Sequence, residues 1–278
     1  MREKKKFAAE NCDVLFETEP SFPIDDREVC GCRQKTITAG EVRECEIYPI
    51  YGRRAFLSRA RKERATPEKQ KKQNAKNTRK RIVRLLNANF TKEDIWATFT
   101  YDNKHLPKDM KRARKDLQNY LRRVAYWMEK KKLGPLKYLY VTEYINNGKE
   151  VRIHHHVVMN FPDRDIAERL WNGGGRTQTR RLQPDESGLE GLGRYVSKSR
   201  SVKYEKTWAA SRNLKEPKIT VSDTAISRRR ARDFALNYND AVAYFERQNK
   251  GYKVIEFKPY ISDIVSGVYI YVKMRRRD

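Results

Sequence analysis

Hydrophobic and polar positions follow two different periods along the middle of the chain, and each period predicts a set of elements. Runs rich in β-branched and aromatic residues predict four strands, at 95–101, 136–145, 151–160 and 176–182. Apolar residues three and four positions apart predict three helices, at 108–132, 164–171 and 187–199. The resulting order β-α-β-β-α-β-α favours an α+β fold, in which an antiparallel sheet carries helices on one face.

Different patterns precede and follow this central domain, which we place at residues 95–220. Residues 1–52 mix acidic and basic groups with prolines, and we interpret them as an N-terminal extension of unknown role. Residues 53–94 are a basic helical segment. Residues 221–278 are predicted to form a basic helix and a pair of strands that pack on the central domain.

The basic helical segment contains an apolar stripe at helical spacing that includes Ile82, Leu86 and Phe90. The basic residues around this stripe are Arg79, Lys80, Arg81 and Arg84. The segment is either a solvated helix that packs on the core or a helix that contacts the DNA backbone, and both interpretations can hold together.

The formal net charge of +26 narrows the class of partner. A small domain needs a charge of only about 2–8 to stay in solution, so a merely solvated surface does not account for it. Phosphate groups reward dispersed Lys and Arg, which favours nucleic acid. A membrane is less suitable, because the chain has no long apolar stretch and no lipidation signal.

The four cysteines, Cys12, Cys30, Cys32 and Cys45, all lie in the first fifth of the chain. Their spacing does not match a zinc knuckle, so we interpret them as reduced thiols of a cytoplasmic protein, with a small zinc-bound N-terminal module as the alternative. The first residues lack an apolar export signal, which agrees with a cytoplasmic location.

Three of the four histidines stand in a row, His154-His155-His156, inside the strand at 151–160. Side chains alternate along a strand, so His154 and His156 share a face, and two imidazoles on one face make half of a metal site. The alternative is a polar edge strand that carries histidines by chance.

The preceding strand supplies a carboxylate. Asn147-Gly148 predicts a two-residue hairpin turn, which pairs Glu143 with Arg152. Cross-strand partners share a face, so Glu143 is expected beside His154 and His156, diagonal to His154 at roughly 7–8 Å between backbones.

A second group of residues, Tyr195 and Lys198, lies three positions apart on a predicted helix and therefore on one helical face. A phenol with a pKa near 10 becomes a nucleophile when a nearby cation favours the phenolate, and Lys198 and a metal can supply that field. The alternative is a buried tyrosine beside a surface lysine.

Together these motifs resemble the HUH endonuclease superfamily, specifically the single-tyrosine rolling-circle replication initiators of phages and integrative elements. The resemblance rests on residues 98–102 (Thr-Phe-Thr-Tyr-Asp), Glu143-Tyr144, His154-His155-His156 and Tyr195-Val196-Ser197-Lys198, and it covers residues 79–220. His155 departs from the family by occupying a hydrophobic position, so this residue either packs or contacts DNA. Trp171, the glycines after it and the Arg-rich strand that follows are similar to the phage branch.

The resemblance implies a ferredoxin-like HUH catalytic domain that nicks single-stranded DNA at a replication origin. Glu143, His154 and His156 would hold one Mn²⁺ or Mg²⁺ ion, and Tyr195 would attack the phosphodiester with help from Lys198. The product is a 5′-phosphotyrosine and a free 3′-hydroxyl that a polymerase extends before the strand is rejoined. The residues that we expect to contact DNA are Arg79, Arg81, Arg84, Tyr101, Tyr144, Arg152 and Arg194.

A host helicase and polymerase are implied as partners in a bacterial cytoplasm, since no Walker sequence occurs in the chain. A transposase or a mobilisation relaxase shares the same chemistry. A two-histidine, one-carboxylate iron oxygenase explains the three candidate metal ligands but not the charge or Tyr195. A non-catalytic single-stranded nucleic-acid binder explains the charge and the aromatic residues alone, and the histidine spacing excludes a helical zinc peptidase.

Overall fold

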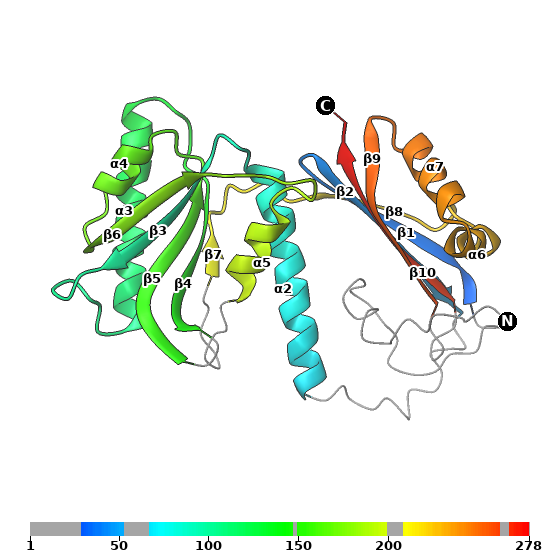
Figure 1. Ribbon diagram of the computed structural model, residues 1–278, viewed down its shortest axis with the longest axis horizontal. Coiled ribbons are helices and arrows are strands. Elements are labelled where there is room, and N and C mark those ends of the chain that lie inside the picture. Colours follow the sequence, from blue (N-terminus) through cyan, green and yellow to red (C-terminus); the bar gives the residue numbers. More distant parts are fainter. Residues whose placement is uncertain (1–28, 53–66, 147–148, 199–207, 262–266, 278) are drawn as a thin grey trace. The chain divides into compact units, whose positions relative to one another are not determined.

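The computed structural model describes residues 29–52, 67–146, 149–198, 208–261 and 267–277 (Figure 1). Contacts divide the chain into two compact units. Unit 1 combines residues 1–81 with residues 217–278, and unit 2 consists of residues 82–216. Each unit contains one five-stranded antiparallel sheet.

The sheet of unit 2 has the strand order β6-β3-β5-β4-β7. Its strands are β3 (Ile95–Tyr101), β4 (Tyr138–Asn146), β5 (Lys149–Met159), β6 (Gly174–Arg181) and β7 (Trp208–Ala210). Three helices alternate with them, α3 (Met110–Lys130), α4 (Arg164–Arg169) and α5 (Glu190–Lys198). The predicted α+β class and the order β-α-β-β-α-β-α are confirmed.

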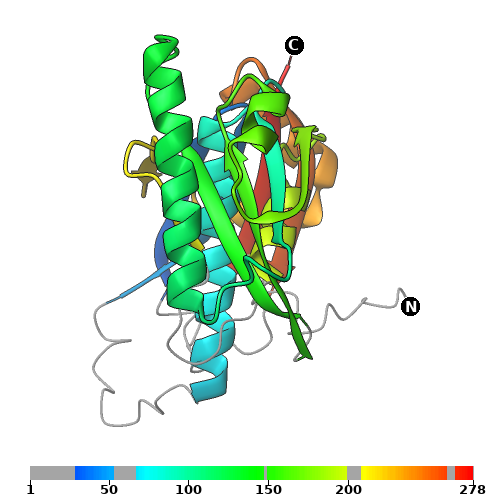
Figure 2. The same cartoon turned by 90° about the vertical axis from the view of Figure 1, so that its left-hand side faces the viewer.

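One face of this sheet packs against α3 and α4 (Figure 2). Leu117, Tyr120 and Val124 of α3 are buried against Phe99 and Val157 of the sheet. Alternate residues on these strands point to the two faces, so the apolar stripe of α3 covers only one of them.

Helices also contact the second face, which the sequence prediction had not included. Ile82 and Leu86 of α2 (Pro67–Asn89) and Val196 of α5 form a buried cluster with Val141 and Val158. This face carries the candidate metal ligands, so α5 is placed above them.

The register of the β4–β5 hairpin differs from the prediction. Asn146 pairs with Lys149 as expected, but Glu143 pairs with His154 and not with Arg152. A bulge places two additional residues of β5 between these pairs. A shift of two residues keeps every side chain on its face, so the predicted common face of Glu143 and the two histidines survives the wrong register.

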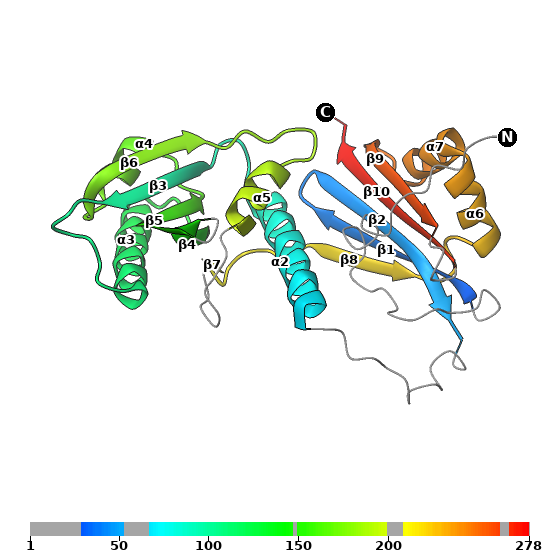
Figure 3. The same ribbon diagram turned by 60° about the horizontal axis from the view of Figure 1, so that its bottom comes forward.

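The sheet of unit 1 has the order β8-β1-β2-β10-β9. Its strands are β1 (Val29–Ala39), β2 (Val42–Tyr51), β8 (Lys218–Ser222), β9 (Tyr252–Ile261) and β10 (Val268–Arg276). Figure 3 shows α6 (Arg228–Leu236) and α7 (Tyr238–Gln248) beside one face of this sheet. Phe234 and Phe245 are buried there with Cys45, Ile270 and Val272.

Unit 1 changes the interpretation of the flanking segments. The sequence predicted separate extensions at 1–52 and 221–278, with the latter packing on the central domain, whereas β2 pairs directly with β10 in one sheet. The single helix expected at 224–248 is two helices, because the backbone of Asn237 is extended. Residues 53–66, part of the predicted basic helical segment, lie outside the described residues.

The described cysteines belong to unit 1. None of Cys30, Cys32 and Cys45 is in a disulfide, and Cys32 and Cys45 are core side chains. Among the described helices, none is long and apolar enough to cross a membrane.

Candidate metal and nucleophile site

Three potential metal ligands converge on one face of the unit 2 sheet. His154 Nε2 lies 3.3 Å from Glu143 Oε2, and His156 Nε2 lies 3.9 Å from the same oxygen. The three ligand atoms lie within 4.8 Å of one another, and within the described part of the chain this is the group of His, Cys, Asp or Glu side chains with that property. The hairpin places them, because Glu143 is directly opposite His154 and His156 is two residues further along the strand.

Neighbouring groups orient both imidazoles. His154 Nδ1 donates to the carbonyl oxygen of Arg152 at 2.8 Å, and His156 Nδ1 lies 3.0 Å from the hydroxyl of Thr98 on β3. Trp96 stacks on the His156 ring with centroids 4.9 Å apart and an angle of 9° between the planes. With both Nδ1 atoms engaged, both Nε2 atoms are directed at Glu143.

The electrostatics of the group suit a cation. Burial works to raise the pKa of Glu143, but the hydrogen bond from His154 and the charges of both imidazoles outweigh it and lower the pKa. The same hydrogen bond raises the pKa of His154, whereas burial lowers the pKa of His156 to about 4. A proton on His154 Nε2 therefore stands between the imidazole and the carboxylate, in the position that a bound metal ion takes when it displaces ligand protons.

One carboxylate oxygen and two imidazole nitrogens are an open three-ligand set that fits a divalent cation. The residues that could hold the ion are Glu143, His154 and His156, all of them largely buried, with relative exposures of the side chains of 10%, 22% and 6%. The donor set is thus compatible with the predicted cofactor, while the identity of the ion rests on chemistry alone.

Tyr195 lies beside this group. Its hydroxyl is 3.3 Å from His156 Nε2, its ring meets the His156 ring edge to face at 5.3 Å, and 45% of the residue is exposed. Burial raises the pKa of the phenol, and the negative charge of Glu143 raises it further. A cation bound to Glu143 offsets that charge and so favours the phenolate.

The start of α5 is anchored to the last turns of α2. Asn87 Oδ1 accepts a hydrogen bond from the backbone of Leu189 at 2.7 Å. Gly193 then approaches Val83 so closely that a Cβ atom at position 193 would lie 2.4 Å from Cγ2 of Val83. Val196, buried in the adjacent core, fixes the opposite side of the helix. These contacts direct Tyr195 toward His156.

His155 packs and does not face DNA. It is fully buried on the other face of the sheet, where Tyr101 and Thr142 hydroxyls lie 2.7 Å from Nε2 and 2.8 Å from Nδ1. Burial lowers its pKa to about 3, so the ring is neutral. The expectation of an exposed Tyr101 that stacks on DNA is wrong, because Tyr101 is 3% exposed and its hydroxyl is engaged with His155.

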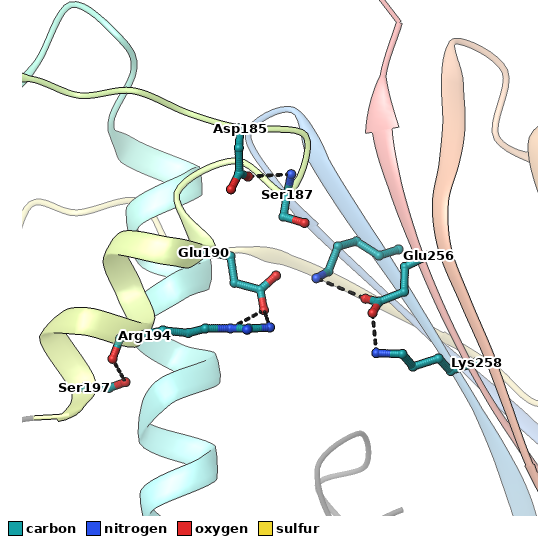
Figure 4. A network of polar contacts seen from close by, with 8 residues as sticks. Asp185, Ser187, Glu190, Arg194, Ser197, Glu256 and Lys258 are labelled. Carbon is teal, nitrogen blue, oxygen red and sulfur yellow. Dashed lines mark hydrogen bonds and ion pairs between the residues drawn. The ribbon is translucent and has the colours of Figure 1, made fainter. Parts of the chain in front are cut away.

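The predicted DNA-contacting residues of unit 2 have different surroundings. The exposed Arg152 donates through Nε to the carbonyl of Tyr101 at 3.1 Å and through Nη2 to Asn103 at 2.8 Å. Arg194 is exposed and pairs with Glu190 one turn earlier on α5 (Figure 4). Tyr144 is half-buried. Lys198 is the last residue of α5, and its side chain lies outside the described part.

The three arginines predicted on α2 are not equivalent. Arg79 and Arg81 are exposed. Arg84 is 7% exposed, so the expectation of a direct phosphate contact from this residue is wrong.

Sequence reasoning missed Trp96, Thr98 and Gly193 as parts of the site. Thr98 belongs to the Thr-rich strand and alternates in phase with the histidine face, which is the signal that identifies it. Gly193 carries no such signal, because its role depends on how two helices approach each other.

Comparison with known proteins gives one match, in the part of the chain that carries this site. No curated protein and no solved structure matches the chain. Residues 94–204 match a family model described as replication-associated protein ORF2, a match that supports a replication initiator family for this chain.

Proposed function

We propose that the protein is a replication initiator that nicks single-stranded origin DNA through Tyr195. The observation that carries the proposal is the 3.3 Å separation between the Tyr195 hydroxyl and His156 Nε2, inside a segment similar to replication-associated proteins. A nucleophile beside a potential metal site is the arrangement that phosphoryl transfer requires.

In the proposed reaction the phenolic oxygen of Tyr195 attacks phosphorus and its proton is lost to solvent. The bond between phosphorus and the 3′-oxygen breaks, and that oxygen takes up a proton. The products are a 5′-phosphotyrosine and a free 3′-hydroxyl, which a host polymerase extends. Reversal by a new 3′-hydroxyl restores the tyrosine and rejoins the strand, because the covalent link conserves the phosphodiester.

Glu143, His154 and His156 would hold one Mn²⁺ or Mg²⁺ ion, and the two imidazoles favour Mn²⁺. When bound, the ion polarises the scissile phosphate and offsets charge on its non-bridging oxygens. Thr98 and Trp96 keep the His156 ring in position. Lys198 stabilises the phenolate or the phosphate charge.

Arg152, Arg194 and Tyr144 are the proposed DNA contacts around the site, and Arg79 and Arg81 are proposed contacts with the backbone. A host helicase and polymerase in the bacterial cytoplasm complete the system. A transposase or relaxase uses the same chemistry, and the site residues do not distinguish these contexts.

Tyr195→Phe tests the proposal with end-labelled single-stranded DNA of randomised sequence. The variant is expected to keep Mn²⁺ affinity and DNA binding and to lose cleavage, and chelation of metal from the native protein is expected to stop cleavage until Mn²⁺ is restored. Cleavage by Tyr195→Phe at the native rate would refute Tyr195 as the nucleophile.

Glu143→Gln is the companion variant. It keeps the size of the side chain and removes its charge, so a loss of Mn²⁺ affinity with native folding is expected. Native Mn²⁺ affinity in this variant would remove Glu143 from the ligand set.

A further inference from the structure

Unit 1 presents an exposed arginine surface on its two helices. Residues 228–232 of α6 read Arg-Arg-Arg-Ala-Arg, and Arg229, Arg230 and Arg232 are exposed. The first turn of α6 contains no acidic residue. Cations near a helix N-terminus oppose the helix dipole, so helix stability does not account for this cluster.

The surface continues onto α7 through a shared aromatic ring. The guanidinium of Arg230 lies 5.4 Å from the ring centre of Tyr244, and that of Arg247 lies 6.0 Å from the same centre. Two arginines on one ring are held near each other before any ligand arrives, which reduces the ordering cost of binding.

Few acidic groups balance this charge. Between residues 228 and 250 six arginines and lysines stand against three acids, Asp233, Asp240 and Glu246. Glu246 is already engaged, since it pairs with Arg277 at 2.6 Å and accepts the backbone N–H of Val254 at 2.9 Å. The net charge of the surface is therefore positive.

The chemistry of the surface selects among polyanions. Arginine presents a planar fork of donors that matches phosphate oxygens. Single strands are held mainly by stacking of bases on exposed rings. Here Arg230 and Arg247 lie against the Tyr244 ring, Phe234 and Phe245 are buried, and the exposed Tyr238 packs edge-on against Phe257.

A membrane surface fits less well than a nucleic acid. An interfacial helix inserts an apolar face into lipid. The apolar face of α6, formed by Ala231 and Phe234, is buried in the core of unit 1, and Leu236 is an isolated exposed apolar residue of this helix.

We propose that the arginine surface formed by Arg229, Arg230, Arg232 and Arg247 binds the phosphate backbone of double-stranded DNA. This gives unit 1 a role as a second DNA-binding unit, independent of the nicking chemistry in unit 2. Because the contacts are to phosphates, the binding is sequence-independent and strongly dependent on salt.

The test uses the full chain and a short fluorescent duplex of arbitrary sequence, titrated at several salt concentrations. The triple variant Arg229→Ala, Arg230→Ala, Arg232→Ala is expected to bind the duplex at least about tenfold more weakly, with a salt slope shallower by about 2–3. The matching triple change to lysine keeps the charge and is expected to retain most of the affinity. Removing cations from the start of α6 is not expected to lower the melting temperature.

A matched control removes the same charge elsewhere. Lys111, Lys115 and Arg122 are exposed on α3, and their triple change to alanine is expected to alter duplex binding less than the α6 variant does. Equal losses in the two triples would show that net charge alone governs binding, and would overturn the proposal.

Three further arms complete the test. An equal loss of affinity for a single strand of the same length would contradict the duplex as partner. Loss of binding to anionic phosphatidylserine vesicles, with native duplex binding, would assign the surface to membranes. Cleavage of single-stranded DNA by the α6 variant is expected at the native rate, which separates this proposal from that for Tyr195.

Discussion

Gly193 of α5 contacts Val83 of α2 so closely that a Cβ atom on Gly193 would lie 2.4 Å from Cγ2 and 3.2 Å from Cα of Val83. Gly193→Ala must therefore displace α5, and Tyr195 moves with it. Misplacement of a nucleophile by about 1 Å can reduce the rate by about 100-fold. We expect a single-turnover nicking rate reduced by at least about tenfold. Mn²⁺ affinity should be native, because the ligands lie on β4 and β5.

Gly191 provides the control on the same helix. A Cβ atom there meets nothing within 4 Å, so Gly191→Ala is expected to leave nicking unchanged and to stabilise the protein by about 0.5–1 kcal/mol. Equal losses of nicking in the two variants would mean that the helix, and not the Gly193–Val83 approach, is being disturbed.

Thr98 positions a ligand without touching the metal. Its hydroxyl lies 3.0 Å from His156 Nδ1, and Thr98→Val removes that hydroxyl at nearly constant shape. Loss of such a supporting hydrogen bond typically lowers metal affinity about 10- to 100-fold, and we expect a decrease of this size in a Mn²⁺ titration. Thr98→Ser should restore most of the affinity. If Thr98→Val binds Mn²⁺ as the native protein does, Thr98 has no positioning role.

The central fold and the ligand set could be predicted from sequence because their signals are local. Alternation along 151–160 places His154 and His156 together, and Asn147-Gly148 marks the hairpin that brings Glu143 to them. The bulge in β5 has no clear local signature, yet it shifts the register by two and leaves the face intact.

What could not be predicted depends on contacts between distant segments. The pairing of β2 with β10 joins residues more than 200 positions apart, and no local pattern specifies it. Tyr101 illustrates the same limit, since a tyrosine in a polar strand is read as exposed until α3 is known to cover that face. Gly193 is functional only because Val83 lies against it.

Tyr101 and His155 form a buried polar pair that supports the histidine strand. Tyr101→Phe leaves His155 Nε2 without its 2.7 Å partner, and an unsatisfied buried polar group costs about 1–3 kcal/mol. We expect urea unfolding of this variant to be destabilised by that amount. Tyr126→Phe, at a site that is 58% exposed, should unfold like the native protein. Comparable losses in both variants would contradict the assignment.

The buried thiols of unit 1 should resist alkylation. Burial raises the pKa of Cys45 from 9.0 to about 11, and burial also raises the pKa of Cys32. Since the thiolate is the reactive form, we expect iodoacetamide near neutral pH to label the exposed Cys30 far faster than either. Tandem mass spectrometry assigns the sites.

The same shift has a consequence for stability. Cys45 binds its proton more tightly in the folded state, so its contribution is complete below pH 9.0 and is lost as the pH rises through about 11. Rapid labelling of Cys45 in the native protein at neutral pH would contradict its place in the core.

The polarity of a covalent protein–DNA adduct tests the account most directly. Single-stranded DNA is labelled at either end and incubated with the protein and Mn²⁺, and the products are denatured and mapped by mass spectrometry. The account predicts that the 3′-labelled fragment stays attached to the peptide that contains Tyr195, while the 5′-labelled fragment is released with a free 3′-hydroxyl. Cleavage with no adduct, or an adduct on any other residue, would contradict it.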